Sequence, residues 1–143
     1  MSVPSNPSQA LAVRWFQKAE NDLLNVENNL KAQYYAGDTV CFHCQQAAEK
    51  YLKGFLAWYQ KPFARTHDLL ELLAQVQQLV GDEAQVLRRH LILLDPYSVS
   101  SRYPQEYEEE PDEDEVREAV ESAYVVRTWV RSKLNLEPER KQG

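Results

Sequence analysis

The segment 97–104 carries the side chains best suited to hold a phosphate and a base. It reads Tyr-Ser-Val-Ser-Ser-Arg-Tyr-Pro, and so combines hydroxyl groups, a guanidinium group and aromatic rings. A guanidinium group binds phosphate through two parallel hydrogen bonds, and an aromatic ring stacks on a base. We name four candidate ligand-binding residues here: Tyr97, Ser101, Arg102 and Tyr103. The alternative is structural, with the arginine bonding helix carbonyls and the tyrosines packing in a core.

A second candidate site begins at Arg65 and places the imidazole of His67 directly before the carboxylate of Asp68. Histidine changes charge near neutral pH, so His67 is a candidate general acid or base. Arg65 is a candidate ligand-binding cation. The alternative is again structural, because these residues stand at the start of a predicted helix, where Thr66, His67 and Asp68 would cap the first turn.

Cys41 and Cys44 resemble half of a metal site, but the other half is missing. A structural zinc ion needs four ligands, and the sequence has no second pair of cysteines or histidines at a suitable spacing. Haem attachment is excluded because Gln45, and not histidine, follows Cys44. We therefore expect two buried, reduced thiols, no metal and no cofactor.

The run 106–115 is strongly acidic and reads Glu-Tyr-Glu-Glu-Glu-Pro-Asp-Glu-Asp-Glu. Its carboxylates could hold a divalent cation, or they could mimic a nucleic acid and attract a basic partner. The alternative is a solvated loop followed by a helix start, where acidic residues are favoured by the helix dipole.

The overall charge limits any contact with nucleic acid to a local surface. The chain has 143 residues and a net charge of −6, which does not attract nucleic acid as a whole. Hydrophobic residues make up 43%, enough for one core, and we expect a single domain over 1–143 with a core at 8–134 and a polar tail. No apolar run approaches the roughly 20 residues that span a bilayer, and no secretory signal is evident, so we expect a cytoplasmic protein.

Apolar residues recur at helical spacing along almost the whole chain, which predicts an all-α fold without strands. The first helix is expected at 8–32 with Ser8 as its N-cap. Its apolar residues form one stripe that we expect to face the core: Ala12, Trp15, Phe16, Ala19, Leu23, Val26 and Leu30. The other boundaries follow from capping and breaking residues: a second helix from Asp38 or Thr39 to before Pro62, a third from Thr66 to Gly81, a fourth over 82–94 stopped by Pro96, and a fifth after Pro111.

The second helix, at about 40–59, has an apolar face that covers close to half of its circumference. This face is wider than a one-sided core stripe, and we expect that one chain does not bury it all. A partner is therefore predicted. The remaining face carries five polar residues: His43, Gln46, Lys50, Lys53 and Lys61.

Four motifs, taken in order, resemble the HEPN family, a nucleotide-binding domain shared by higher eukaryotes and prokaryotes. The first helix carries Trp-Phe-x-x-Ala at 15–19 with Asp-Leu at 22–23, and the second carries Cys-Gln-Gln-Ala-Ala-Glu-Lys-Tyr-Leu-Lys at 44–53. His-Asp-Leu-x-x-Leu-Leu follows at 67–73, and Arg-Tyr-Pro at 102–104. The resemblance covers residues 10–134, nearly the whole chain.

The resemblance implies an up-and-down bundle of four to five helices that pairs as a homodimer with a groove at the interface. It also implies a minimal nucleotidyltransferase as partner, in a toxin–antitoxin pair. Members that cleave RNA carry an arginine, four to six intervening residues and then a histidine. This sequence lacks that pair, because the same spacing from Arg102 reaches Tyr107, Glu108 and Glu109.

Two hypotheses follow, and we favour the first. In the first, the protein is a non-catalytic dimeric module that binds a nucleotide or a nucleotidyltransferase through Arg102, Tyr97 and Tyr103, with Arg65 and His67 nearby. In the second, it is a metal-independent endoribonuclease toxin. Arg102 would then stabilise the phosphorane, and Tyr107 or His67 would replace the missing histidine. A third alternative is a purely structural assembly domain.

Overall fold

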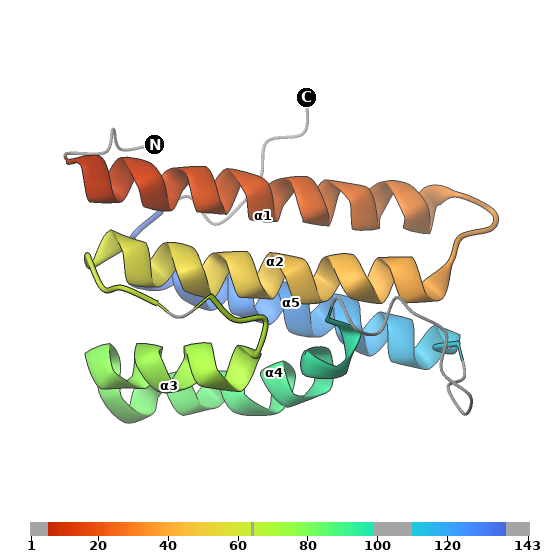
Figure 1. Cartoon of the computed structure of the whole chain (residues 1–143). Coiled ribbons are helices and arrows are strands. Elements are labelled where there is room, and N and C mark those ends of the chain that lie inside the picture. The colour runs from red at the N-terminus through yellow and green to blue at the C-terminus, as the bar shows by residue number, and fades with distance from the viewer. Residues whose placement is uncertain (1–5, 64, 99–109, 137–143) are drawn as a thin grey trace.

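The protein is an all-α bundle, as predicted (Figure 1). A computed structural model describes residues 6–63, 65–98 and 110–136, and no strand is present in those ranges. Five α-helices follow one another: α1 (Pro7–Lys31), α2 (Gly37–Trp58), α3 (Leu69–Val80), α4 (Arg88–Leu94) and α5 (Glu113–Lys133). Two short 3-10 segments, Gly81–Leu87 and Asp95–Tyr97, flank α4.

The α2 helix lies at the centre of the bundle. Figure 1 shows it between α1 and the layer formed by α3 and α4, with α5 behind it. After α2 the chain turns back, with residues 59–63 and 65–68 between the two helices, so that α3 begins beside the middle of α2. This returning segment matters for the site, because it carries Arg65 and His67 back to the polar face of α2.

Three of the predicted helix caps are wrong. Neither Asp38 nor Thr39 is the N-cap of α2, because the helix begins at Gly37 after Ala36, which makes no side-chain capping bond. The other two are wrong for one shared physical reason. Asn6, and not Ser8, caps α1, because its side chain accepts the Gln9 amide at 2.8 Å. Asp68, and not Thr66, caps α3 by accepting the amides of Leu70 and Glu71. The Thr66 hydroxyl instead accepts the Asp68 amide at 2.9 Å. In each case another polar side chain of the same capping class stands at the residue where the backbone becomes helical.

The remaining boundaries agree with the sequence except at one place. The α5 helix begins after Pro111, where Asp112 and Glu115 form a capping box. The α2 helix starts at Gly37, one residue before Asp38, where an added Cβ would lie 3.2 Å from the Pro111 carbonyl oxygen. The predicted fourth helix at 82–94 is wrong in its first half, which is 3-10 in geometry and follows the positive φ of 77° at Gly81.

Most of the wide apolar face of α2 is buried within one chain, so its width does not by itself require a second chain. Tyr51 and Phe55 have no exposed surface, and both Cys41 and Cys44 are buried thiols, as predicted. Helices of the same chain lie against α2 on several sides, which explains why nearly half of its circumference is apolar. Only the end of this face remains open, at Tyr59, which is 44% exposed.

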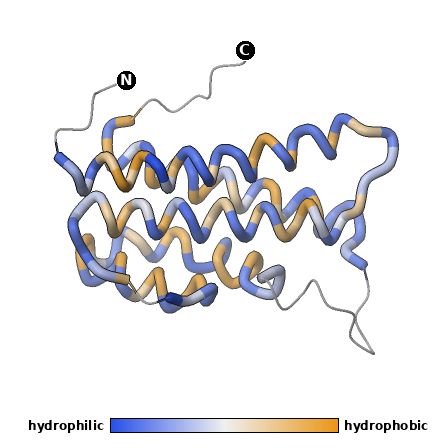
Figure 2. Tube along the Cα trace, turned by 45° about the horizontal axis from the view of Figure 1, so that its top comes forward, coloured by the Kyte–Doolittle hydropathy of each residue, from blue (hydrophilic) through white to orange (hydrophobic). Residues whose placement is uncertain are grey.

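The other helices are amphipathic in the usual way. Figure 2 shows hydrophobic and hydrophilic residues alternating turn by turn along α1. Two members of its predicted inward stripe are exceptions, since Trp15 is only half-buried and Leu30 is 40% exposed. Within the described ranges, no helix is both long and apolar enough to cross a membrane.

Candidate functional site

Two buried carboxylates lie along the polar face of α2. Asp22 comes from α1 and is 8% exposed, and Glu49 comes from α2 and is 3% exposed. Each contacts one lysine and one histidine. Buried carboxylates are rare unless they are paired, so these two acids define the centre of the site.

Asp22 contacts His43 and Lys50, which stand seven residues apart on α2 and therefore on the same side of it. The Lys50 ammonium donates to Asp22 Oδ2 at 2.6 Å. The His43 Nδ1 lies 2.8 Å from Asp22 Oδ1. An ionised carboxylate only accepts hydrogen bonds, so Nδ1 carries the proton and Nε2 lies on the opposite edge of the ring.

Glu49 contacts Lys53 and His67 in the same manner. The Lys53 ammonium donates to Glu49 Oε2 at 2.9 Å, and His67 Nδ1 lies 3.1 Å from Oε1. Gln45 completes the cluster, because its amide donates both to Glu49 Oε1 and to the His67 carbonyl oxygen, each at 3.2 Å. Gln45 thereby holds the returning segment against α2. The His67 side chain is 57% exposed, although the carboxylate that orients it is buried.

An aromatic pair borders this cluster on the side of α1. The rings of Trp15 and Phe63 meet edge to face, with centroids 5.8 Å apart. The Lys53 ammonium lies 5.7 Å from the Trp15 ring and 5.9 Å from the Phe63 ring. Lys53 is therefore held by a carboxylate and by two aromatic rings at once.

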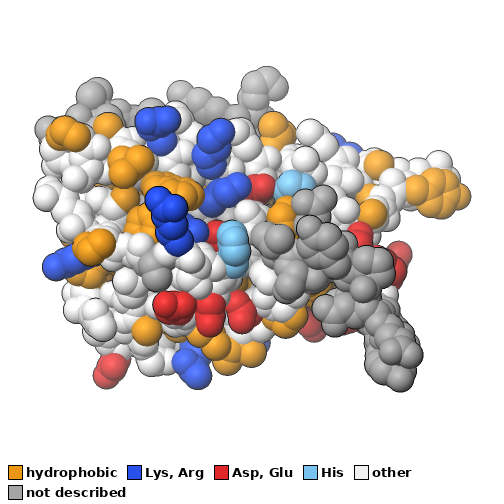
Figure 3. Space-filling view, viewed as in Figure 1, with side chains coloured by type: hydrophobic (Ala, Val, Ile, Leu, Met, Phe, Trp, Pro, Cys, Tyr) orange, Lys and Arg blue, Asp and Glu red, His pale blue; other side chains and the backbone are white. Residues whose placement is uncertain are grey.

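Together these groups form a local basic surface on an acidic protein. We call it the basic face and define it by six residues: Lys18, His43, Lys50, Lys53, Arg65 and His67. Lys18 is exposed and stands four residues before Asp22 on α1, and Arg65 is exposed on the returning segment. Figure 3 shows Lys, Arg and His side chains gathered near the middle of this side of the molecule, with a row of Asp and Glu side chains along one edge of the group. The net charge of −6 limits any contact with a polyanion to a local surface, and the basic face is the candidate for such a surface.

A family model decides the identity of the fold. The HEPN domain matches residues 12–133, nearly the whole chain. The chain belongs to the HEPN family. No curated protein and no solved structure matches it.

The HEPN domain brings only some of the predicted site residues together. Arg65 and His67 lie on the basic face, but the carboxylate that contacts the His67 ring is Glu49 and not the neighbouring Asp68. Tyr97 lies elsewhere, half-buried against Cys41 near the start of α2. Burial, followed by the neighbouring Cys41 and Glu115, raises the pKa of Tyr97 to about 12. The other four predicted residues are outside the described part of the chain: Ser101, Arg102, Tyr103 and Tyr107.

The structure describes only part of the residues to which the metal prediction and the acidic-run prediction refer. In the described ranges, no three His, Cys, Asp or Glu side chains come together as metal ligands. Of the acidic run, Asp112 and Glu115 form the cap of α5, and Glu113 and Asp114 lie exposed in its first turn. These residues therefore serve the helix start, where the positive end of the dipole favours carboxylates.

Sequence reasoning missed the two acids that organise the basic face of this HEPN domain. It placed Lys53 on the outer face of its helix, whereas Lys53 is 7% exposed and paired with Glu49. The signal was available in the four-residue spacing of Gln45, Glu49 and Lys53, which puts all three on one side of α2. Asp22 had no comparable signal, because its partners lie 21 and 28 residues further along the chain.

A second polar cluster joins α1 to α5 on another side of α1. Glu20 Oε2 accepts the Arg127 Nε at 2.8 Å and also the Tyr51 hydroxyl, to which Arg131 donates at 3.4 Å. Burial lowers the pKa of Arg127, but Glu20 outweighs this effect and raises it overall. Burial, reinforced by Glu20, raises the pKa of Tyr51. We call this group the Glu20 cluster.

Proposed function

We propose that this HEPN protein is a nucleotide-binding or RNA-binding module whose ligand phosphates lie on the basic face. The observation that carries the proposal is the pairing of one lysine and one histidine with each of two buried carboxylates. Such pairing fixes the cationic groups in place before a ligand arrives, which reduces the entropy lost on binding.

The geometry leaves binding capacity at the surface. An ammonium group has three donors, and Asp22 takes up one donor of Lys50, whose side chain is 23% exposed. His67 presents Nε2 on the edge of the ring that faces away from Glu49. The half-buried rings of Trp15 and Phe63 offer a stacking surface for a base beside these donors. Phosphate contacts and base stacking together are what a single-stranded ligand requires.

The first test is binding of AMP and of a labelled octaribonucleotide, measured by calorimetry and by fluorescence anisotropy. Lys50→Ala is expected to weaken binding by about tenfold and to lower the salt dependence by about one phosphate contact. Lys31→Ala, an exposed lysine in the last turn of α1, is the matched control and is expected to change neither quantity. An equal effect of both variants, or no binding of either ligand at millimolar concentration, would overturn the proposal.

Two further parts of the proposal come from the family alone: pairing as a homodimer, and association with a minimal nucleotidyltransferase in a toxin–antitoxin pair. The face of α2 that first suggested a second chain is buried, so it no longer supports the dimer. Sedimentation velocity at micromolar concentration tests the dimer. Co-purification with a nucleotidyltransferase from the same operon tests the partnership.

A second candidate function is metal-independent RNA cleavage, and one observation favours it. His67 is an exposed imidazole oriented by a buried carboxylate, the arrangement of a general base. In such a reaction His67 Nε2 takes the proton of a 2′-hydroxyl, and the 2′-oxygen attacks phosphorus. The 5′-oxygen then leaves with a proton from a second donor, for which the Lys50 ammonium, or His43 in its doubly protonated form, is placed on one side of α2. Arg102 and Tyr107 stay candidates for stabilising the phosphorane.

One experiment separates the two functions. The protein is incubated with RNA and EDTA, and 2′,3′-cyclic phosphate ends are sought. Cleavage that is lost in His67→Asn and retained in His90→Asn would establish the enzyme, since His90 instead contacts Ser122 at 3.0 Å. A loss of affinity in His67→Asn, without cleavage by the parent protein, would establish the module.

A further inference from the structure

The α5 helix carries a second apolar stripe that its own chain leaves partly open. One stripe faces the core and includes Ala119, Ala123 and Val126. The other is set to one side and contains Val120 and Tyr124, both of which are only half-buried. A stripe of this kind on the outside of a helix either covers another element or is available to a partner.

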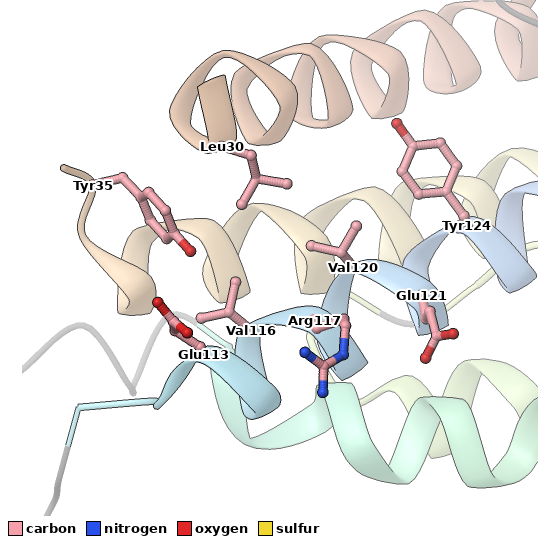
Figure 4. A pocket seen from close by; sticks show the side chains of 8 residues that line it. All are labelled: Leu30, Tyr35, Glu113, Val116, Arg117, Val120, Glu121 and Tyr124. Carbon is pink, nitrogen blue, oxygen red and sulfur yellow. The ribbon is translucent and has the colours of Figure 1, made fainter. Parts of the chain in front are cut away.

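This second stripe forms the floor of a groove between α5 and the end of α1. Val116, Val120 and Tyr124 line the groove from α5, and Leu30 and Tyr35 line it from α1 and the loop that follows (Figure 4). Its volume is about 350 Å³. Leu30, which the sequence assigned to the core, is one of its exposed walls at 40%.

A second, shallower hollow lies beside the first and is lined by α5 alone. It has a volume of about 460 Å³, shares Glu121 and Tyr124 with the first, and adds Val125, Thr128 and Trp129. The two hollows run from residue 113 to residue 129 of α5, which corresponds to about 24 Å of helix. We call the two hollows together the α1–α5 groove. Its length matches a helix of about four turns lying against α5.

The charges around the groove have one predominant sign. Two exposed carboxylates of α5, Glu113 and Glu121, line the groove. Arg117 is the one cation among the lining residues, and it is already paired with Asp114 at 2.5 Å. Of the cations next to the lining, Lys133 near Trp129 is paired with Glu83, and Lys31 is exposed beside Leu30. An occupant must therefore supply basic side chains on either side of an apolar stripe.

We propose that the α1–α5 groove docks a basic amphipathic helix of a partner protein. RNA is a poor occupant, because the rim would repel its phosphates. A second copy of this chain is also disfavoured, since it would bring the same excess of carboxylates to the interface. A basic helix satisfies both parts of the groove: its apolar residues fill the floor, and its lysines or arginines neutralise the rim. This docking site is separate from the basic face and does not depend on the proposed nucleotide binding.

The test uses two synthetic peptides of about 18 residues with the same leucine residues at helical spacing. Lysine fills the polar positions of one peptide, and glutamate fills those of the other. Binding to the full chain is measured by fluorescence anisotropy, and the bound region is located by hydrogen exchange. We expect the lysine peptide to bind and to protect residues 113–129, and the glutamate peptide to bind at least tenfold more weakly, in line with charge complementarity.

Two variants and two controls show whether the groove is responsible. Val125→Asp places a charge on a residue that is already 36% exposed, and Glu121→Lys reverses one rim charge. Each variant is expected to bind the lysine peptide about tenfold more weakly than the parent protein does. Glu121→Lys should also bind the glutamate peptide more tightly. Val86→Asp and Glu71→Lys alter exposed residues that do not line the groove and should change nothing. Thermal unfolding followed by circular dichroism is the check that all four variants fold.

Several results would overturn the proposal. Equal affinity for both peptides would mean that the rim charge selects nothing, and equal weakening by the control variants would place the contact elsewhere. Displacement of the lysine peptide by the octaribonucleotide would mean that the two ligands share one surface. A dimer in sedimentation that Val125→Asp dissociates would show that a second copy, and not a basic helix, occupies the groove.

Discussion

Glu20 and Asp22 stand only two residues apart on α1, yet they belong to different kinds of polar cluster. Two residues correspond to about 200° of helical rotation, so the two side chains leave α1 on different sides. Glu20 contacts Arg127 of α5 and Tyr51, whose hydroxyl group meets the Glu20 carboxylate. Asp22 contacts His43 and Lys50 at the edge of α2.

The difference lies in how much of each cluster is accessible to solvent. Arg127 is 6% exposed and Tyr51 is not exposed at all, whereas the Glu20 side chain is 18% exposed, so the Glu20 cluster joins helices and its cation offers little surface to a ligand. The basic face also has buried carboxylates, but the side chains of Lys50 and His67 are 23% and 57% exposed. Buried acids with accessible cations are expensive to keep for stability alone, which is why we assign the ligand to the second cluster.

The largest effect is expected for Arg127→Met in the Glu20 cluster. The change leaves the Glu20 carboxylate without the Arg127 cation in a mostly buried place, while Tyr51 keeps only the longer contact with Arg131, and we expect the free energy of unfolding to fall by about 3 kcal/mol. Urea denaturation measures it. Arg117→Met is the control, because its pair with Asp114 is exposed and should contribute less than about 0.5 kcal/mol. Similar losses in the two variants would contradict the structural role of the Glu20 cluster.

Glu49→Gln should have a smaller effect on stability and an additional effect on binding. The amide keeps the shape of the carboxylate but leaves the buried Lys53 ammonium without a counter-charge. We expect a loss of about 2 kcal/mol in urea denaturation, together with weaker octaribonucleotide binding because His67 is no longer oriented. Glu71→Gln, an exposed acid of α3, should change neither measurement. A stable variant with unchanged affinity would remove Glu49 from the site.

The comparison also shows what sequence reasoning can and cannot reach. Helical periodicity, proline and the acidic start of α5 predicted the fold class and most of the boundaries, because those signals are local. The width of the α2 apolar face was predicted correctly, but this width does not by itself imply a second chain, since a helix at the centre of a bundle and a helix at an interface share one pattern. Asp22 was overlooked because its partners are distant in sequence, whereas Glu49 could have been found from its four-residue spacing to Lys53.

Asp22→Asn sharpens the comparison within the basic face. Asp22 is more accessible than Glu49, with 10% of its side chain exposed against 4%, so we expect a stability loss of about 1 kcal/mol. In this variant the Lys50 ammonium is no longer held by a carboxylate. It should still bind phosphate but less selectively, so the Kd for AMP rises while the salt dependence of binding stays unchanged. The matched control is Asn21→Asp, an exposed neighbour on α1. A change in Asp22→Asn as large as that in Glu49→Gln would mean that the two carboxylates act as one unit.

Tyr51→Phe is expected to have the smallest effect at neutral pH and a clear signature at alkaline pH. Removing the hydroxyl group costs about 1 kcal/mol, because Glu20 keeps its contact with Arg127. Burial and Glu20 raise the pKa of Tyr51 above its ordinary value of 10.0, so above pH 10 the unfolded chain loses a proton that the folded chain retains. The folded state then binds more protons, and its stability falls as pH rises through that range. The free energies of unfolding of parent and variant, measured by urea denaturation, should therefore converge above pH 10. If the two free energies stay a constant distance apart as pH rises, Tyr51 does not titrate as part of the Glu20 cluster.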